Sequence, residues 1–115
     1  MKLNYIYAAR YVSAYDADTI RLDIDLGFGT WLINQPIRLF GIDAPEVRGP
    51  EKLAGKEARD FLRKFLEGNK DNIIINTYKS SNKGKYGRWL AEVYVGDINV
   101  NRMLVDRGFA KEAHY

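Results

Sequence analysis

The chain has 115 residues, of which 18 are Lys or Arg, 15 are Asp or Glu, one is His and none is Cys, giving a formal charge of +3. This length accommodates one domain, so we expect a single domain over residues 1–115. The lack of cysteine excludes disulfides, thiol nucleophiles and cysteine-ligated metal sites, and one histidine argues against a His-based metal cage or a Ser–His–Asp triad. Any chemistry must therefore rest on carboxylates, guanidinium groups, hydroxyls and backbone carbonyls.

The N-terminal part is predicted to form two strands joined by a short acidic turn. Aromatic, β-branched and small residues dominate from Leu3 to Tyr15, which is typical of a strand. Asp16-Ala17-Asp18 then indicates a turn. Apolar and polar residues alternate from Thr19 to Leu26, which predicts a half-buried strand. Its expected inner face consists of Ile20, Leu22, Ile24 and Leu26.

A third strand is predicted over residues 31–42, after a glycine-rich hairpin turn. Pro36 interrupts it, and a proline inside a strand indicates an edge position or a bulge. In a regular strand Arg38 and Ile42 share one face, whereas Leu39 takes the other.

An amphipathic helix is predicted to follow, between Pro50 and Gly68. Proline suits the first helical position and glycine suits a C-terminal cap. The apolar residues between them recur at helical spacing and are expected on the inner face. They are Ala54, Ala58, Phe61, Leu62, Phe65 and Leu66.

The remaining chain predicts two strands and a second helix. Residues 73–78 and 88–95 fit strands, and the basic segment 79–87 fits the loop between them. Residues 99–107 fit a short helix that Gly108 ends. This order predicts a mainly β, α+β fold: a five-stranded OB-type barrel with two to three flanking helices. An open α+β sheet would have the same order.

Two acids lie close together at the first turn. One residue separates Asp16 from Asp18, so their oxygens can converge on one point. The other interpretation is an Asx turn, in which Asp16 binds the backbone of its own turn. Spacing alone favours the Asx turn.

The third strand combines an arginine with acids at its end. Arg38 leads to Asp43-Ala44-Pro45-Glu46. A desolvated guanidinium needs an anionic partner, so one interpretation is a structural ion pair with Asp43 or Glu46. The other is a phosphate-binding fork beside a metal-binding carboxylate. Both fit the local sequence.

Basic residues alternate with glycine and aromatic rings from Lys83 to Trp89. Such a segment lets the backbone approach a phosphate while rings stack on bases. A solvated hairpin loop is the commoner fate of such a run. The glycine and lysine order of a P-loop is absent.

Together these three segments resemble the staphylococcal nuclease (thermonuclease) family. The matching motifs are Asp16-Ala17-Asp18-Thr19, the run from Arg38 to Glu46, and Lys85-Tyr86-Gly87-Arg88. The likeness continues through Val100–Val105 and Gly108–Lys111. It covers nearly the whole chain and implies the five-stranded OB-type barrel.

The resemblance also implies a metal site. Asp18, Asp43 and the backbone carbonyl of Ala44 match the family's Ca²⁺ ligands, and Ca²⁺ takes oxygen ligands of this kind. One position departs from the pattern, because Ala17 stands where the family usually has glycine. If that turn required a positive φ, alanine would cost roughly 1 kcal/mol and could displace Asp18.

The remaining family positions imply catalysis and substrate binding. Glu46 would position or deprotonate the attacking water. Arg38 and Arg88 would neutralise the charge that develops on the phosphate. Lys85 and Tyr86 match positions that contact a terminal phosphate of a bound nucleotide.

The resemblance therefore implies a Ca²⁺-dependent phosphodiesterase, an endonuclease-like hydrolase of DNA and RNA with little sequence preference. Water would attack phosphorus and the bond to the 5′ oxygen would break. The alternative is a catalytically weak or inactive OB-fold module that binds nucleic acid. We expect a monomer that prefers single-stranded or frayed substrates and does not bind membranes. It would be cytoplasmic if Met1 is the native start, or secreted if a signal segment was removed.

Overall fold

The computed structural model describes residues 5–77 and 88–113. The basic loop over 79–87 lies outside the described residues, and so do Lys85 and Tyr86 within it. Within the described ranges, no helix has the length and apolar character needed to cross a membrane.

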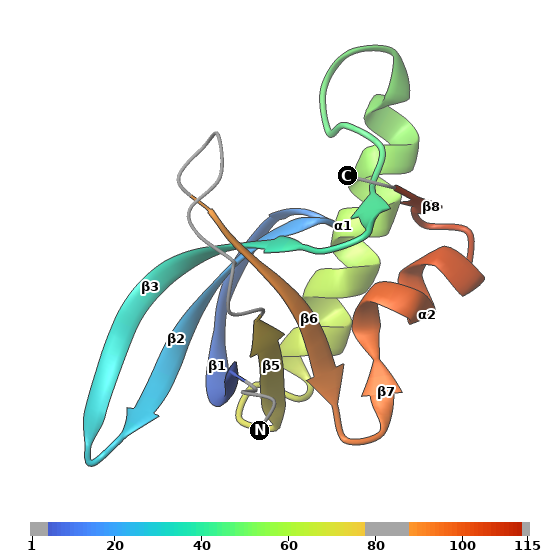
Figure 1. Cartoon of the computed structure of the whole chain (residues 1–115). Helices are drawn as coiled ribbons and strands as arrows, with labels where there is room; N and C mark the ends of the chain where they lie inside the picture. The colour runs from blue at the N-terminus through green and yellow to red at the C-terminus, as the bar shows by residue number, and fades with distance from the viewer. Residues whose placement is uncertain (1–4, 78–87, 114–115) are drawn as a thin grey trace.

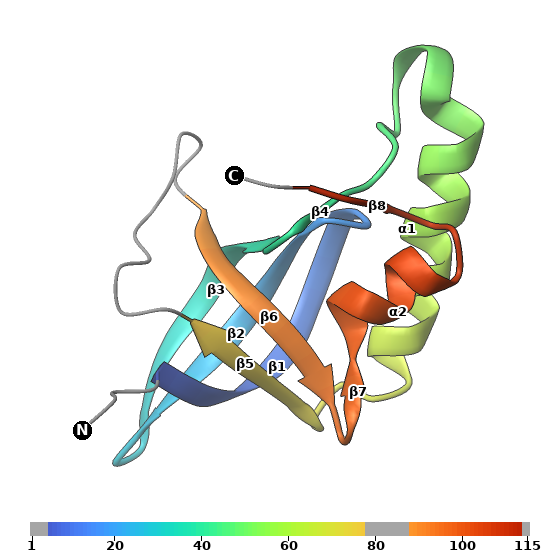
Figure 2. The same ribbon diagram turned by 45° about the vertical axis from the view of Figure 1, so that its right-hand side comes forward.

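Five strands close into a barrel (Figures 1 and 2). Three consecutive strands form an antiparallel meander, and β5 and β6 then pair with each other, with β5 beside β1. A parallel pairing of β3 with β6 closes the barrel, which confirms the predicted architecture. The strands are β1 (Tyr5–Asp16), β2 (Thr19–Gly27), β3 (Thr30–Leu39), β5 (Ile73–Thr77) and β6 (Trp89–Val95).

Short strands and helices complete the described fold. β4 and β8 pair antiparallel, and β7 pairs with β6. The helices α1 and α2 lie on one side of the barrel, while the β2–β3 hairpin extends on the other (Figure 1). These elements are β4 (Ile42–Asp43), η1 (Gly49–Glu51), α1 (Lys52–Glu67), β7 (Ile98–Asn99), α2 (Val100–Asp106) and β8 (Lys111–Glu112).

The inner face of β2 agrees with the prediction except at its end. Ile20, Leu22 and Ile24 are buried in the core, as alternation requires. Leu26 is 38% exposed. The pairing of β1 with β2 runs no further along β2 than Asp25, so Leu26 lies in the part of the hairpin that extends past the barrel. The bulge predicted around Pro36 is present as a register shift between β2 and β3 just before it.

The third strand does not run regularly to Ile42, and the predicted shared face of Arg38 and Ile42 is wrong. β3 ends at Leu39, and the chain turns through Gly41, which has a φ of +81°. That turn breaks the alternation, so Ile42 joins Leu39 in the core with only 3% exposure.

A buried asparagine holds this turn in place. Asn101 at the start of α2 donates through Nδ2 to the carbonyls of Phe40 (2.8 Å) and Ala91 (3.2 Å). Its Oδ1 accepts from the backbone N–H of Val93 at 3.0 Å. One side chain therefore ties the end of β3 to β6, and every polar atom in it has a partner.

The helix α1 follows the predicted pattern in its second half and departs from it in its first turn. Ala58, Leu62 and Leu66 are buried as expected, but Ala54 is exposed and Gly55 is buried. A Cβ at Gly55 would lie 2.8 Å from the nitrogen of Val47 and closer still to the carbonyl group of Glu46. Only glycine lets α1 approach the loop that carries Glu46.

We expect Gly55→Ala to lower the free energy of unfolding by about 1–3 kcal/mol, since overpacking outweighs the better helix propensity of alanine. Chemical denaturation monitored by circular dichroism measures this loss. Gly68→Ala is the matched control, because Gly68 has a right-handed φ of −68° and room for a methyl group. That variant should be neutral or slightly stabilised. Equal changes in unfolding free energy for the two variants would contradict the close approach of α1 to the Glu46 loop at Gly55.

Candidate active site

The acidic turn between β1 and β2 contains the predicted Asx turn. The Asp16 carboxylate accepts the backbone N–H of Asp18 at 3.1 Å. Both acids are buried, and burial, followed by the hydrogen bond and charge of Asp18, raises the pKa of Asp16 to about 7. Ala17 is also buried and does not have a positive φ, so alanine causes no left-handed strain here.

Arg38 links two aspartates that come from different elements. Its Nη1 lies 3.2 Å from Oδ2 of Asp18, and its Nη2 forms an ion pair with Oδ1 of Asp43. The side chains of Arg38 and Asp18 are only 12% and 11% exposed, whereas that of Asp43 is 62% exposed. Both predicted metal-ligating carboxylates therefore converge on one cationic group.

The backbone after β4 is bound to the same aspartate. The N–H of Ala44 donates to Oδ2 of Asp18 at 2.7 Å. This bond fixes the loop from Ala44 to Glu46 relative to the β1–β2 turn. Glu46 itself is exposed on that loop, with its backbone packed beneath Gly55.

Thr19 joins Arg88 to this cluster and is the contributor that the sequence prediction did not assign a role. Its hydroxyl donates to Oδ1 of Asp18 at 3.1 Å and accepts from Nη1 of Arg88 at 3.0 Å. Pairing of β3 with β6 places Arg38 opposite Leu90, two residues after Arg88, which immediately precedes β6. The place of Thr19 at the end of the Asp16-Ala17-Asp18-Thr19 motif was the signal in the sequence that could have identified it.

The structure thus brings together most of the predicted site residues. Asp18, Arg38, Asp43 and Ala44 are in direct contact, and Arg88 reaches them through Thr19. Glu46 is three residues beyond Asp43 on the loop that follows. Lys85 and Tyr86 lie outside the described residues.

The oxygen donors fit a hard cation. Two carboxylates, those of Asp18 and Asp43, already share the positive charge of Arg38. Among residues 5–77 and 88–113, no three His, Cys, Asp or Glu side chains gather at one point. A Ca²⁺ ion here would need carbonyl and water oxygens beside the two aspartates, a mixture that Ca²⁺ accepts.

Comparison with known families bears directly on this site. The staphylococcal nuclease homologue family model matches residues 36–115, which include Arg38, Asp43, Glu46 and Arg88. The chain belongs to this family. Asp18 and Thr19 precede the matched range, so the family model does not cover them. The contacts described above connect both residues to the site.

Relatives of this staphylococcal nuclease homologue extend the likeness toward the N-terminus. The thermonuclease of Staphylococcus hyicus is 33% identical over 109 residues, covering 92% of this chain and 59% of that protein. The thermonuclease of Staphylococcus intermedius is 35% identical over 103 residues, which cover 87% of this chain and 56% of that protein. The SPbeta prophage-derived endonuclease YokF of Bacillus subtilis is 29% identical over 102 residues, which cover 88% of this chain and 32% of that protein. The chain spans little more than half the length of the two thermonucleases.

We expect Arg38→Met to lower the free energy of unfolding by about 3 kcal/mol, because it leaves the buried Asp18 charge unpaired. Arg10→Met is the matched control, since Arg10 pairs with Asp71 where the two side chains are 49% and 74% exposed. An exposed pair contributes less than about 1 kcal/mol. Urea titration without metal measures the unfolding free energy of both variants. Equal losses in the two would contradict a stabilising buried ion pair between Arg38 and Asp18.

Proposed function

We propose that this protein is a Ca²⁺-dependent phosphodiesterase that cleaves DNA and RNA with little sequence preference. The observation that carries the proposal is the convergence of Asp18 and Asp43 on Arg38, with Arg88 joined to the same cluster through Thr19. Carboxylates that can hold a metal ion, together with guanidinium groups that can bind a phosphate, suit phosphodiester hydrolysis. Membership of the family and relatives named as nucleases support this assignment.

The two arginines would bind the scissile phosphate. Guanidinium groups form paired hydrogen bonds to phosphate oxygens and stabilise the negative charge that grows as water attacks. Arg38 lies in β3 and Arg88 immediately precedes β6. These strands are paired, so the two arginines can approach one phosphate from two sides. Thr19 orients Arg88 through its hydroxyl.

Glu46 would serve the attacking water. A carboxylate that is exposed can reach a water molecule and accept its proton. Its loop is held by the Ala44–Asp18 hydrogen bond on one side and by Gly55 beneath it. The electron pair of the breaking bond then passes to the 5′ oxygen, which takes up a proton from solvent water and leaves as the hydroxyl.

Asp18, Asp43 and the carbonyl of Ala44 would hold Ca²⁺. Bound Ca²⁺ supplies positive charge that stabilises the phosphate during hydrolysis. Asp18 serves this site and also positions Thr19 and the Ala44 loop, so one side chain couples metal binding to the geometry of both arginines.

A cavity beside Arg88 supports a single-stranded substrate. It has a volume of about 490 Å³ and is lined by Thr19, Arg21 and Arg88 together with the ring of Tyr15. The Tyr15 side chain is 54% exposed, which leaves its face open to an unpaired base.

We expect the purified protein to cleave single-stranded DNA with Ca²⁺ and to lose this activity in EDTA. Arg88→Met should lower kcat by about 10²–10³-fold, because one charge-stabilising donor is lost from the transition state. Arg10→Met, which removes a guanidinium on the barrel surface, should retain full activity. Absence of EDTA-sensitive cleavage by the wild type would contradict the proposal and favour a nucleic-acid-binding module.

Calcium binding has a readout that is independent of activity. We expect Ca²⁺ to raise the Tm of the wild type, since a ligand that binds only the folded state stabilises it. Asp43→Ala should abolish that rise. Asp71→Ala, which removes an equally exposed carboxylate elsewhere, should keep it. Differential scanning fluorimetry with and without Ca²⁺ measures these shifts, and a rise retained in Asp43→Ala would refute the ligand assignment.

A further inference from the structure

A basic channel runs along α1, outside the predicted active-site residues. Its cavity has a volume of about 490 Å³. Five cationic side chains line it together with Tyr15, Val47 and Gly49, and no acidic residue does. The cations are Arg48, Lys52, Lys56, Arg59 and Arg63.

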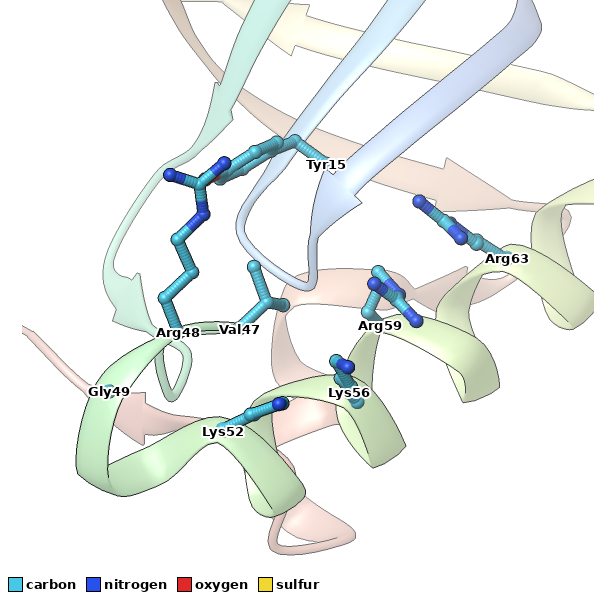
Figure 3. A pocket seen from close by; sticks show the side chains of 8 residues that line it. All are labelled: Tyr15, Val47, Arg48, Gly49, Lys52, Lys56, Arg59 and Arg63. Atoms are coloured by element: carbon cyan, nitrogen blue, oxygen red, sulfur yellow. The ribbon is translucent and has the colours of Figure 1, made fainter.

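Helical spacing explains why these cations gather. Four of them follow one another at intervals of four, three and four residues along α1, so they lie on one face. Figure 3 shows them in a row, with Arg48 extending from the preceding loop toward the Tyr15 ring. Lys52 and Arg63 are 11 residues apart, which is about 16 Å of helix. That length matches roughly four to five phosphates of a stacked strand.

The two ends of the channel differ in how firmly they are held. Arg63 donates through Nε (3.0 Å) and Nη2 (2.8 Å) to the carbonyl of Ala14 in β1. Arg59 pairs with Asp60 on the same helix at 2.9 Å. Lys52 is exposed and Lys56 is half-exposed, so both ammonium groups can reach an anion in the channel.

The channel continues into the cavity beside the active site. Tyr15 and Arg63 line both cavities. The second cavity is also lined by Thr19 and Arg88, which belong to the proposed catalytic cluster. An extended polyanion that enters at Arg88 would therefore pass Arg63 and follow α1.

We propose that this basic channel binds the phosphate backbone of single-stranded nucleic acid outside the scissile bond. The assignment rests on the proposed function for its substrate class. A row of cations with no acidic residue among those that line the cavity attracts a phosphate backbone, and the exposed Tyr15 ring offers a stacking platform between the two cavities. Long substrates would then bind more tightly than dinucleotides.

The test compares two double variants on a fluorescent 20-nucleotide single-stranded DNA in EDTA. Lys52→Gln/Lys56→Gln removes two channel cations, and Lys64→Gln/Lys70→Gln removes two cations at the end of α1 that do not line the channel. Fluorescence anisotropy at several salt concentrations gives Kd and its salt dependence. Circular dichroism verifies that both variants fold.

We expect the channel variant to bind about tenfold more weakly than the wild type at 0.1 M salt, with a log–log salt slope shallower by about 1.4. The control variant should bind within about twofold of the wild type. Equal binding by the two variants, or no binding by the wild type, would overturn the proposal that this channel binds single-stranded nucleic acid. Cleavage of the same DNA by the wild type with Ca²⁺ tests the proposed function separately. Weak binding by the channel variant, with no cleavage by the wild type, would retain the channel and reject the enzyme.

Discussion

The arrangement of this site depends on the ion pairs of Arg38 with Asp18 and Asp43. Bringing two carboxylates together costs free energy through repulsion and desolvation, and a shared guanidinium offsets that cost. The bridge also joins three parts of the chain: the turn after β1, the end of β3 and the short β4. Around it, Asp18 orders its neighbours by accepting hydrogen bonds from Thr19 and from the backbone of Ala44.

Contacts within the barrel and with the helices hold the residues of this cluster in position. Parallel pairing of β3 with β6 places Arg38 near Arg88, which immediately precedes β6, and the Asn101 side chain holds the two strands together through three hydrogen bonds. The turn at Gly41 redirects the chain so that Ile42 anchors β4 in the core while Asp43 stays exposed. On the other side, Gly55 lets α1 press against the Glu46 loop. Each support is a packing or backbone constraint rather than a catalytic group.

Sequence reasoning predicted the elements that repeat a pattern and missed those that depend on a single contact. Alternation in β2 and helical spacing in α1 predicted their buried faces, because periodicity reflects which side meets the core. The buried Gly55 and the inward Ile42 broke those patterns, since a neighbouring loop and a left-handed glycine override local periodicity. Motif likeness located the acids and arginines of the site. It did not predict Thr19 as their connection, nor the channel in which Tyr15 and Arg48 meet the α1 cations, because both arise from tertiary contact.

The central claim is that this cluster directs water to a phosphodiester and breaks the bond to the 5′ oxygen. Cleavage of single-stranded DNA in ¹⁸O-labelled water with Ca²⁺, followed by mass spectrometry of the products, tests it most directly. The account predicts fragments with a 3′-phosphate that carries one ¹⁸O atom and partners with an unlabelled 5′-hydroxyl. Products with 5′-phosphates, or 3′-phosphates without the label, would contradict it.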